Sequence, residues 1–163
     1  MDRLEDLKNL LTEYGEEIDS TKTTIEVNSL ECISSSVPNE PGVYWIGTTM
    51  PTGEMQSAIS QFTSKAKKIR VNPPRSTKMI KQTSVYSYVV YSGTEEDINK
   101  RLKQHLFNEG SDETGKLGCK IDEEPFSNYS WSVSFQIIDS YELRYAVEAW
   151  WRLNKGWPIF CLR

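Results

Sequence analysis

The chain has 163 residues and a net charge of −4, with 37% hydrophobic and 26% charged residues, which fits a single globular domain. No apolar run approaches the roughly 20 residues of a membrane span. The charged start MDRLEDLKNLL also lacks the core of a signal peptide, so we expect a soluble protein. Three widely spaced cysteines, Cys32, Cys119 and Cys161, argue against a disulfide framework or a zinc knuckle and favour the reducing cytoplasm.

An amphipathic helix is predicted at the N-terminus, with Asp2 as its N-cap and Gly15 as a weak point. Its apolar residues recur at spacings of three and four, at Leu4, Leu7, Leu11, Tyr14 and Ile18. We expect this face to pack on the chain's own core, with a short coiled-coil seam as the alternative. The β-branched stretch TTIEVNSLECI that follows predicts a strand. Residues 1–36 are therefore treated as an extension of a domain that spans 37–163.

The first core strand is expected over Gly42–Thr49, and a long connection follows it at about 50–83, with a helix around Met55–Ile69. This connection holds seven of the 19 basic residues and a single acidic one, Glu54. The basic residues are Lys65, Lys67, Lys68, Arg70, Arg75, Lys78 and Lys81. A basic segment on an otherwise acidic chain favours contact with a polyanion such as nucleic acid. A solvated loop without a specific partner is the alternative.

Two more strands and two more helices complete the predicted domain. The strand over Ser84–Gly93 alternates aromatic and β-branched residues, and Thr94 then caps a helix that ends at Gly110. A strand over Trp131–Asp139 and a helix over Ser140–Gly156 follow. The buried faces are expected to hold Ile98, Leu102 and Leu106 in the first helix, and Leu143, Ala146, Val147, Trp150 and Leu153 in the second. The order predicts an α+β domain with a small three-stranded antiparallel sheet flanked by helices.

Residues suited to phosphate chemistry occur at the ends of these elements. Two strands carry a tyrosine close to glycine, in Gly42-Val43-Tyr44 and in Tyr91-Ser92-Gly93. The next helix carries Arg101 and His105, whose four-residue spacing puts both on one face. Glu148 lies on the last helix.

Each of these residues also has a structural interpretation. The tyrosines could pack in the core as ordinary strand aromatics. Glu148 could be the middle of a solvated ion-pair ladder with Arg144 and Arg152, because the three are spaced four apart. The functional interpretation depends on their occurring together in this order.

Taken in order from Pro41 to Arg163, these motifs resemble the GIY-YIG nuclease domain. The most specific part is Tyr91-x-Gly93 followed by Arg101-x-x-x-His105. The resemblance implies an endonuclease that hydrolyses phosphodiester bonds of double-stranded DNA. It also implies one divalent ion per site, Mg²⁺ or Mn²⁺.

The resemblance and the chemistry of the side chains together assign expected roles. Glu148 would bind the metal ion, and Arg101 would stabilise the charge on the phosphate. Tyr44, with Tyr91 beside it, would position or activate the attacking water. Because ionising a free tyrosine at pH 7 costs about 4 kcal/mol, we expect Tyr44 to hold the water and pass its proton onward, with His105 or a nearby base as the final acceptor.

The chain departs from the family pattern in two places. The connection between the two tyrosine strands is long, and Cys161 occupies the position where the family commonly has an asparagine. The alternative is therefore a catalytically decayed nucleic-acid-binding module, and a third option is a protein-interaction domain whose basic arm binds an acidic partner. Since one such site cuts one strand, double-strand cleavage would need a homodimer, for which the N-terminal helix offers a contact.

Overall fold

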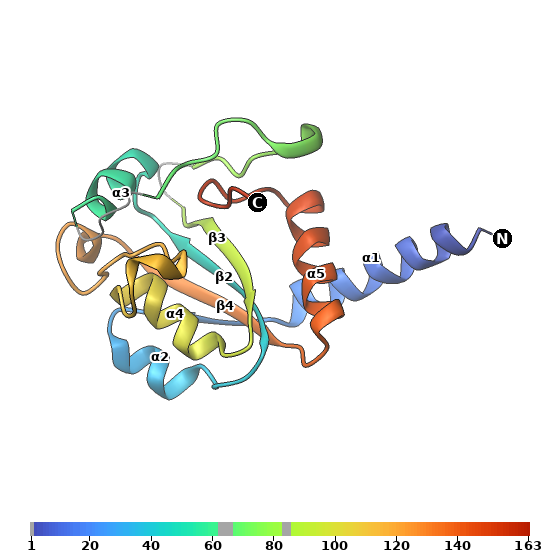
Figure 1. The fold of residues 1–163 in the computed structure, drawn as a ribbon, viewed down its shortest axis with the longest axis horizontal. Coiled ribbons are helices and arrows are strands. Elements are labelled where there is room, and N and C mark those ends of the chain that lie inside the picture. Colours follow the sequence, from blue (N-terminus) through green and yellow to red (C-terminus); the bar gives the residue numbers. More distant parts are fainter. Residues whose placement is uncertain (1, 62–66, 83–85) are drawn as a thin grey trace.

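The computed structural model describes residues 2–61, 67–82 and 86–163 (Figure 1). Within these ranges the helices are α1 (Arg3–Thr21), α2 (Leu30–Ser36), α3 (Thr52–Ile59), α4 (Ile98–Phe107) and α5 (Tyr141–Asn154). The strands are β1 (Thr23–Glu26), β2 (Gly42–Thr48), β3 (Tyr88–Glu95) and β4 (Trp131–Ile137). None of the helices in the described part of the chain combines the length and the apolar character needed to cross a membrane.

The strands form one antiparallel sheet in the order β1-β4-β2-β3. The fold is therefore α+β as expected, but the predicted count of three strands is wrong. The additional strand is β1, which pairs with β4 and places Ile25 opposite Val133. The β-branched stretch was predicted as a strand, yet it is extended only to Glu26. Leu30 then begins α2.

Both faces of the sheet are covered, and β2 is buried along its whole length. Tyr44 and Ile46 point into the larger core, on the side of α2 and α4. Val43 and Trp45 point to the opposite face, towards α5 and the end of α1. A strand with helices on both sides has no polar face, which explains why β2 is apolar rather than alternating.

A β-bulge changes the direction of side chains in β3. Ile46 pairs with Tyr91 and Gly47 pairs with Val89, so that Val90 is the extra residue. Without the bulge, strict alternation would place Tyr91 on the face opposite to that of Val90. With it, Tyr91 shares the face of Ile46 and points to α4.

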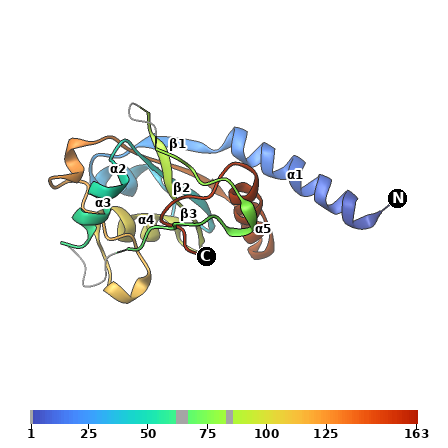
Figure 2. The same cartoon turned by 90° about the horizontal axis from the view of Figure 1, so that it is seen from above.

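Helix α1 divides into a packed half and a projecting half (Figures 1 and 2). At its C-terminal end Ile18 is buried, and Gly15 lies against the Trp150 ring of α5, where an added Cβ would come within 2.3 Å of a ring carbon. Leu4 and Leu7, in the projecting half, are 75% and 63% exposed. The predicted packing on the core is therefore confirmed only for the second half of the helix.

Two helix boundaries differ from prediction. Helix α3 ends at Ile59 instead of Ile69. Thr94 pairs with Val43 inside the sheet, so the N-cap of α4 is Asp97, whose carboxylate accepts the Lys100 N–H.

The ends of α4 and α5 also correct the prediction. Helix α4 stops at Asn108, which adopts the left-handed conformation, rather than at Gly110. In α5, Leu143 and Leu153 are 43% and 47% exposed, not buried. The face turned to the sheet holds Trp151 instead, and it also includes the buried cations Arg144 and Arg152.

The described part of the basic insertion is docked on the C-terminal segment 157–161. The Arg70 N–H donates to the Ile159 carbonyl at 2.6 Å, and Trp157 exchanges backbone hydrogen bonds with Lys78 and Ile80 at 2.8 and 3.0 Å. On its other side this segment bonds to the edge of β3 through the Phe160 N–H and the Val90 carbonyl, 3.2 Å apart. The described part of the insertion is thus packed at the β3 edge and is not a free arm.

Candidate functional site

The five predicted catalytic residues come together around the edge strand β3. Tyr44 and Tyr91 are supplied by the sheet, Arg101 and His105 by α4 on one face, and Glu148 by α5 on the other. A hollow of about 360 Å³ opens beside Tyr91, bordered by Lys67, Arg152 and Cys161 among others. Residues that are distant in sequence therefore meet at one edge of the sheet.

Tyr44 is at the centre of the group, and only 2% of it is exposed. Its hydroxyl is 2.9 Å from His105 Nε2, and its ring stacks on Tyr91 with centroids 6.3 Å apart. Gly93 makes this position possible, since a Cβ there would lie 2.5 Å from the Tyr44 hydroxyl. Burial, together with the neighbouring Tyr91, raises the pKa of Tyr44 well above 10. The glycine and tyrosine motifs therefore belong to a single packing unit.

The hydrogen bonds of His105 determine which ring nitrogen carries its proton. The Leu117 N–H donates to Nδ1 at 2.9 Å, so Nδ1 is an acceptor. In a neutral imidazole the proton must then be on Nε2, which donates to the Tyr44 hydroxyl. Burial, with the charges of Arg101 and Lys67, holds the pKa of His105 well below 6.5. His105 therefore has no free lone pair to receive a proton from Tyr44, which corrects the expected relay.

Arg101 is mostly buried beside Tyr44, with its side chain 14% exposed. Its Nη1 donates to the Thr114 carbonyl and to Gln104 Oε1, each at 2.8 Å, and its Nε lies 3.8 Å from a Glu95 carboxylate oxygen. The charge of Arg101 also acts on Tyr44 and lowers its phenol pKa against the effect of burial. This guanidinium is therefore both fixed in place and close to the reacting centre of the proposed site.

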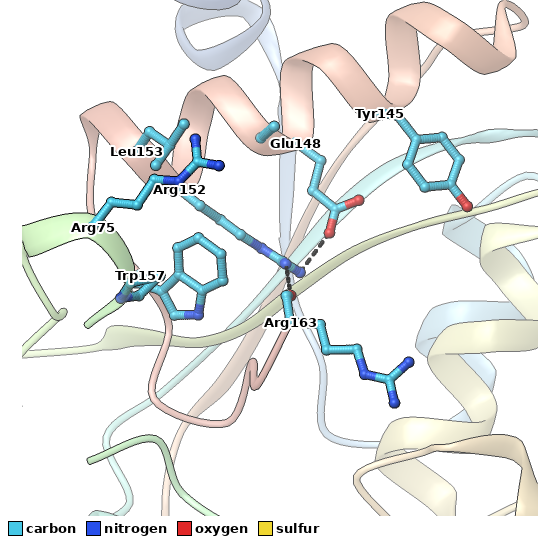
Figure 3. A pocket seen from close by; sticks show the side chains of 9 residues that line it. Arg75, Tyr145, Glu148, Arg152, Leu153, Trp157 and Arg163 are labelled. Atoms are coloured by element: carbon cyan, nitrogen blue, oxygen red, sulfur yellow. Dashed lines mark hydrogen bonds and ion pairs between the residues drawn. The ribbon is translucent and has the colours of Figure 1, made fainter. Parts of the chain in front are cut away.

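Glu148 points inward, with its side chain 15% exposed, and pairs with Arg152 at 2.5 Å (Figure 3). Burial raises its pKa, while Arg152 and a hydrogen bond with Thr94 lower it. Arg144 pairs instead with Glu96, at 3.1 Å. The three α5 residues thus form no solvated ladder, although the Glu148–Arg152 pair of that interpretation is present.

Arg152 links Glu148 to the sheet and to the C-terminal segment. Its Nε and Nη2 donate to the Ser92 hydroxyl and carbonyl at 2.9 and 2.6 Å, and its Nη1 donates to the Arg163 carbonyl. Because both donors and acceptors are buried, this network fixes the position of the Glu148 carboxylate. Arg152 is a positioning residue that sequence reasoning treated only as part of a ladder.

Segment 108–118, which was not predicted to contribute to the site, positions it through its backbone. Thr114 and Gly115 offer consecutive carbonyls to Arg101 and Lys67, at 2.8 and 3.2 Å. Leu117 donates to His105. The segment is tied to the end of α4 by Lys116, whose ammonium donates to three carbonyls. These belong to Asn108, Glu109 and Gly110. Gly115 and Gly118, both at positive φ, are the sequence signal for this tight course.

The predicted basic residues divide into two groups, apart from Lys65, which lies outside the described residues. Lys67 and Arg70 are half-buried, whereas the others are exposed, namely Lys68, Arg75, Lys78 and Lys81. Lys67 Nζ lies 5.4 Å over the Tyr91 ring, and burial lowers its pKa. Arg70 Nε donates to the Cys161 carbonyl at 3.1 Å. The insertion therefore contributes one cation directly to the site.

Cys161 occupies the position where the resemblance would have an asparagine, and it is buried. Its sulfur accepts the Ser92 N–H at 3.3 Å, and its carbonyl accepts Trp157 Nε1 at 2.5 Å. Burial raises the pKa of its thiol. Cys161 thus anchors the C-terminal segment on β3.

A metal ion would find one carboxylate here rather than a complete ligand set. Among the described residues, no group of three or more His, Cys, Asp and Glu side chains is arranged to hold a metal. Glu148 Oε1 faces Arg152, and the carboxylate also accepts a hydrogen bond from Thr94. Mg²⁺ binds to such sites through one carboxylate, several waters and the substrate phosphate, so the residues fit that mode of binding.

No protein-family model, curated protein or solved structure matches this chain.

Proposed function

We propose that this protein is a metal-dependent endonuclease that hydrolyses phosphodiester bonds of DNA. The resemblance of its motifs to the GIY-YIG nuclease domain supports this proposal. The observation that carries the proposal is the proximity of Tyr44, Arg101 and Glu148, which come from three different elements, since both charged side chains act on the Tyr44 phenol at the β3 edge. A phosphodiester reaction needs an oriented water, a cation for the phosphate and a metal ligand, and these three residues offer those functions.

Tyr44 acts in this scheme as a hydrogen-bonding group that orients water. Because its pKa is raised well above 10, the phenol stays protonated at neutral pH. Since His105 donates to the Tyr44 oxygen, the O–H of Tyr44 is free to donate elsewhere. His105 is then a positioning residue that fixes the orientation of the hydroxyl.

Arg101 supplies the positive charge for the phosphate, and its guanidinium also makes a hydrogen bond with Tyr44. Comparable arginines in phosphoryl transfer contribute roughly 10³ to 10⁵ in rate. Lys67, from the insertion, adds a second positive charge, because its ammonium lies over the Tyr91 ring. Both cations are held by carbonyls of segment 108–118, so little reorganisation is needed when substrate binds.

Glu148 would hold Mg²⁺ or Mn²⁺ through its carboxylate. When bound, the ion would polarise the phosphate and lower the pKa of a coordinated water. Arg152 keeps the carboxylate oriented, because its own guanidinium is fixed on Ser92.

A nicking assay tests the proposal. Supercoiled plasmid is incubated with the protein and Mg²⁺, and in parallel with EDTA. We expect conversion to the nicked form with Mg²⁺ alone, and loss of that activity in Arg101→Ala. Absence of cleavage with Mg²⁺ and with Mn²⁺ on duplex, branched and single-stranded DNA would overturn it.

A second candidate is a non-catalytic nucleic-acid-binding module. The close Glu148–Arg152 pair favours it, because a carboxylate neutralised by arginine is a weaker cation ligand. Gel-shift binding without nicking would support this candidate, and failure to bind any nucleic acid at low salt would exclude both.

A further inference from the structure

A second hollow, of about 480 Å³, lies on the α5 side of Glu148 (Figure 3). Its walls come from α5, from the turn at 74–76 of the insertion, and from the C-terminal segment. This volume is in the range of pockets that bind small organic ligands, roughly 300–1,000 Å³. Glu148 and Arg152 border this hollow, and Arg152 also borders the hollow beside Tyr91.

The lining combines an apolar surface with unpaired positive charge. Tyr145 and Leu153 are 50% and 47% exposed where they border it, and Trp157 forms the opposite side. The guanidinium groups of Arg75 and Arg163 make no hydrogen bond or ion pair with any described residue. An aromatic and aliphatic wall beside free guanidinium groups suits a ligand with a flat ring and a phosphate.

The backbone beside this hollow is strained. Arg75 and Ser76 adopt positive φ values of 51° and 59°, which cost non-glycine residues of the order of 1–3 kcal/mol each. The turn that contains them is held by hydrogen bonds on both sides, at Arg70 and at Ile80. The hydrogen bonds of the docked insertion maintain this strained turn. The turn holds Arg75 at the border of the hollow.

We propose that this hollow is the subsite for the nucleotide next to the scissile phosphate, with its base unstacked and placed against Trp157 and Leu153. The inference rests on the proposed function. Because Glu148 is shared with the reacting site, a ligand here must be adjacent to the cleaved phosphate on the same strand. A base can enter only if it leaves the stack, as in enzymes that extrude a nucleotide. Arg75 then contacts its phosphate.

Binding of thymidine 3′,5′-bisphosphate tests the subsite without any need for cleavage. Affinity is measured by isothermal titration calorimetry with the wild type, Ala149→Phe and Leu143→Phe. Ala149 is an exposed residue that borders the hollow, so phenylalanine fills the space without disturbing the core. Leu143 is an exposed residue of the same helix outside the hollow and serves as the matched control.

We expect Ala149→Phe to weaken binding by about tenfold or more, with Tm and the affinity for inorganic phosphate unchanged. Leu143→Phe should bind as the wild type does, and Arg75→Ala should also lose affinity. Undiminished binding by Ala149→Phe, or no binding by the wild type, overturns the subsite.

The nicking assay on the same proteins separates this inference from the proposed function. If the wild type nicks DNA and Ala149→Phe binds the nucleotide as tightly as the wild type does, the subsite alone is refuted. If the wild type binds the nucleotide but does not nick DNA, and Ala149→Phe abolishes the binding, the subsite is supported and the proposed enzyme activity is refuted.

Discussion

His105 shows how much the role of a single residue depends on its hydrogen bonds. As the only histidine, it is the natural choice for a proton acceptor near neutral pH. In the structure it is fully buried, accepts from the Leu117 N–H and donates to Tyr44. It therefore maintains the position of a phenol rather than receiving its proton.

The stability of the protein should depend on pH through His105. Its folded pKa lies well below 6.5, so below that pH the unfolded chain takes up a proton that the folded chain does not. The free energy of unfolding should then fall as the pH decreases, by up to about 1.4 kcal/mol per pH unit. Urea unfolding at pH 7.5, 6.5 and 5.5 measures this. His105→Gln, which keeps a donor for Tyr44, should lack this component, and an identical pH slope in both proteins would contradict the assignment.

Glu148→Gln should reduce nicking by about 10²-fold or more, because a neutral amide is a poor ligand for a divalent cation. In the wild type, activity requires the ionised carboxylate, whose pKa is raised by burial. The rate should therefore rise with pH through a midpoint above that of an ordinary glutamate. Glu142→Gln, at an exposed position of the same helix, is the control. An equal loss in both variants would refute a specific role for Glu148.

At the scale of elements, segment 108–118 connects the end of α4 to the site. Its carbonyls and amides hold two cations and the histidine, and Lys116 binds it to the last carbonyls near α4. Only 7% of Lys116 is exposed. A buried ammonium with three carbonyl acceptors is well satisfied, so its removal leaves those acceptors without a donor.

Lys116→Met should destabilise the protein by about 1.5–3 kcal/mol and lower the activity, although Lys116 touches none of the proposed catalytic residues. The activity should fall because Arg101 and Lys67 lose the fixed position of their carbonyl acceptors. Urea unfolding and nicking rates test both effects. Lys8→Met, the same change at an exposed position of α1, should alter neither. Full activity in a destabilised Lys116→Met would show that the segment does not position the site.

At the scale of the whole molecule, the net charge is negative, but exposed basic residues are concentrated in the insertion. The insertion holds the exposed cations Lys68, Arg75, Lys78 and Lys81, and its backbone is bonded to the C-terminal segment. Nucleic acid bound at the β3 edge would therefore contact the basic residues of the insertion.

Replacing Lys68, Lys78 and Lys81 together with alanine should weaken DNA binding and reduce the slope of log affinity against log salt. The expected reduction is about 0.9 for each lost phosphate contact. Fluorescence anisotropy at several salt concentrations measures this slope. A control that replaces Lys8 and Lys120, outside the insertion, should leave the slope unchanged. The same slope in both variants would remove the insertion from the interface.

The projecting half of α1 is the contact that we propose for a second copy of the chain. Leu4, Leu7 and Leu10 are 75%, 63% and 61% exposed, and two copies would cover them. Leu4→Glu with Leu7→Glu should shift the protein to a monomer in sedimentation equilibrium. Its free energy of unfolding at low concentration should change by less than about 0.5 kcal/mol, since these side chains do not touch the core. A monomeric wild type would refute the contact.

The sequence by itself determined the α+β class and most of the core elements, and it is the source of the residues that we propose for the site. Periodicity predicted β4, and the four-residue spacing of Arg101 and His105 predicted that both lie on one face of their helix. Both follow because strand and helix geometry fix which side chains share a side. Local signals also identified Asp2 as a helix cap, which its bond to the Leu4 N–H confirms.

Tertiary structure decided the features that depend on pairing between distant residues. The bulge that turns Tyr91 towards α4 exists only in register with β2, and the fourth strand exists only against β4. The direction of the His105 hydrogen bond follows from a backbone amide 12 residues away. The docking of the insertion follows from bonds to Trp157 and Ile159. Local sequence cannot specify such contacts, because their free energy arises only when the whole chain has closed around them.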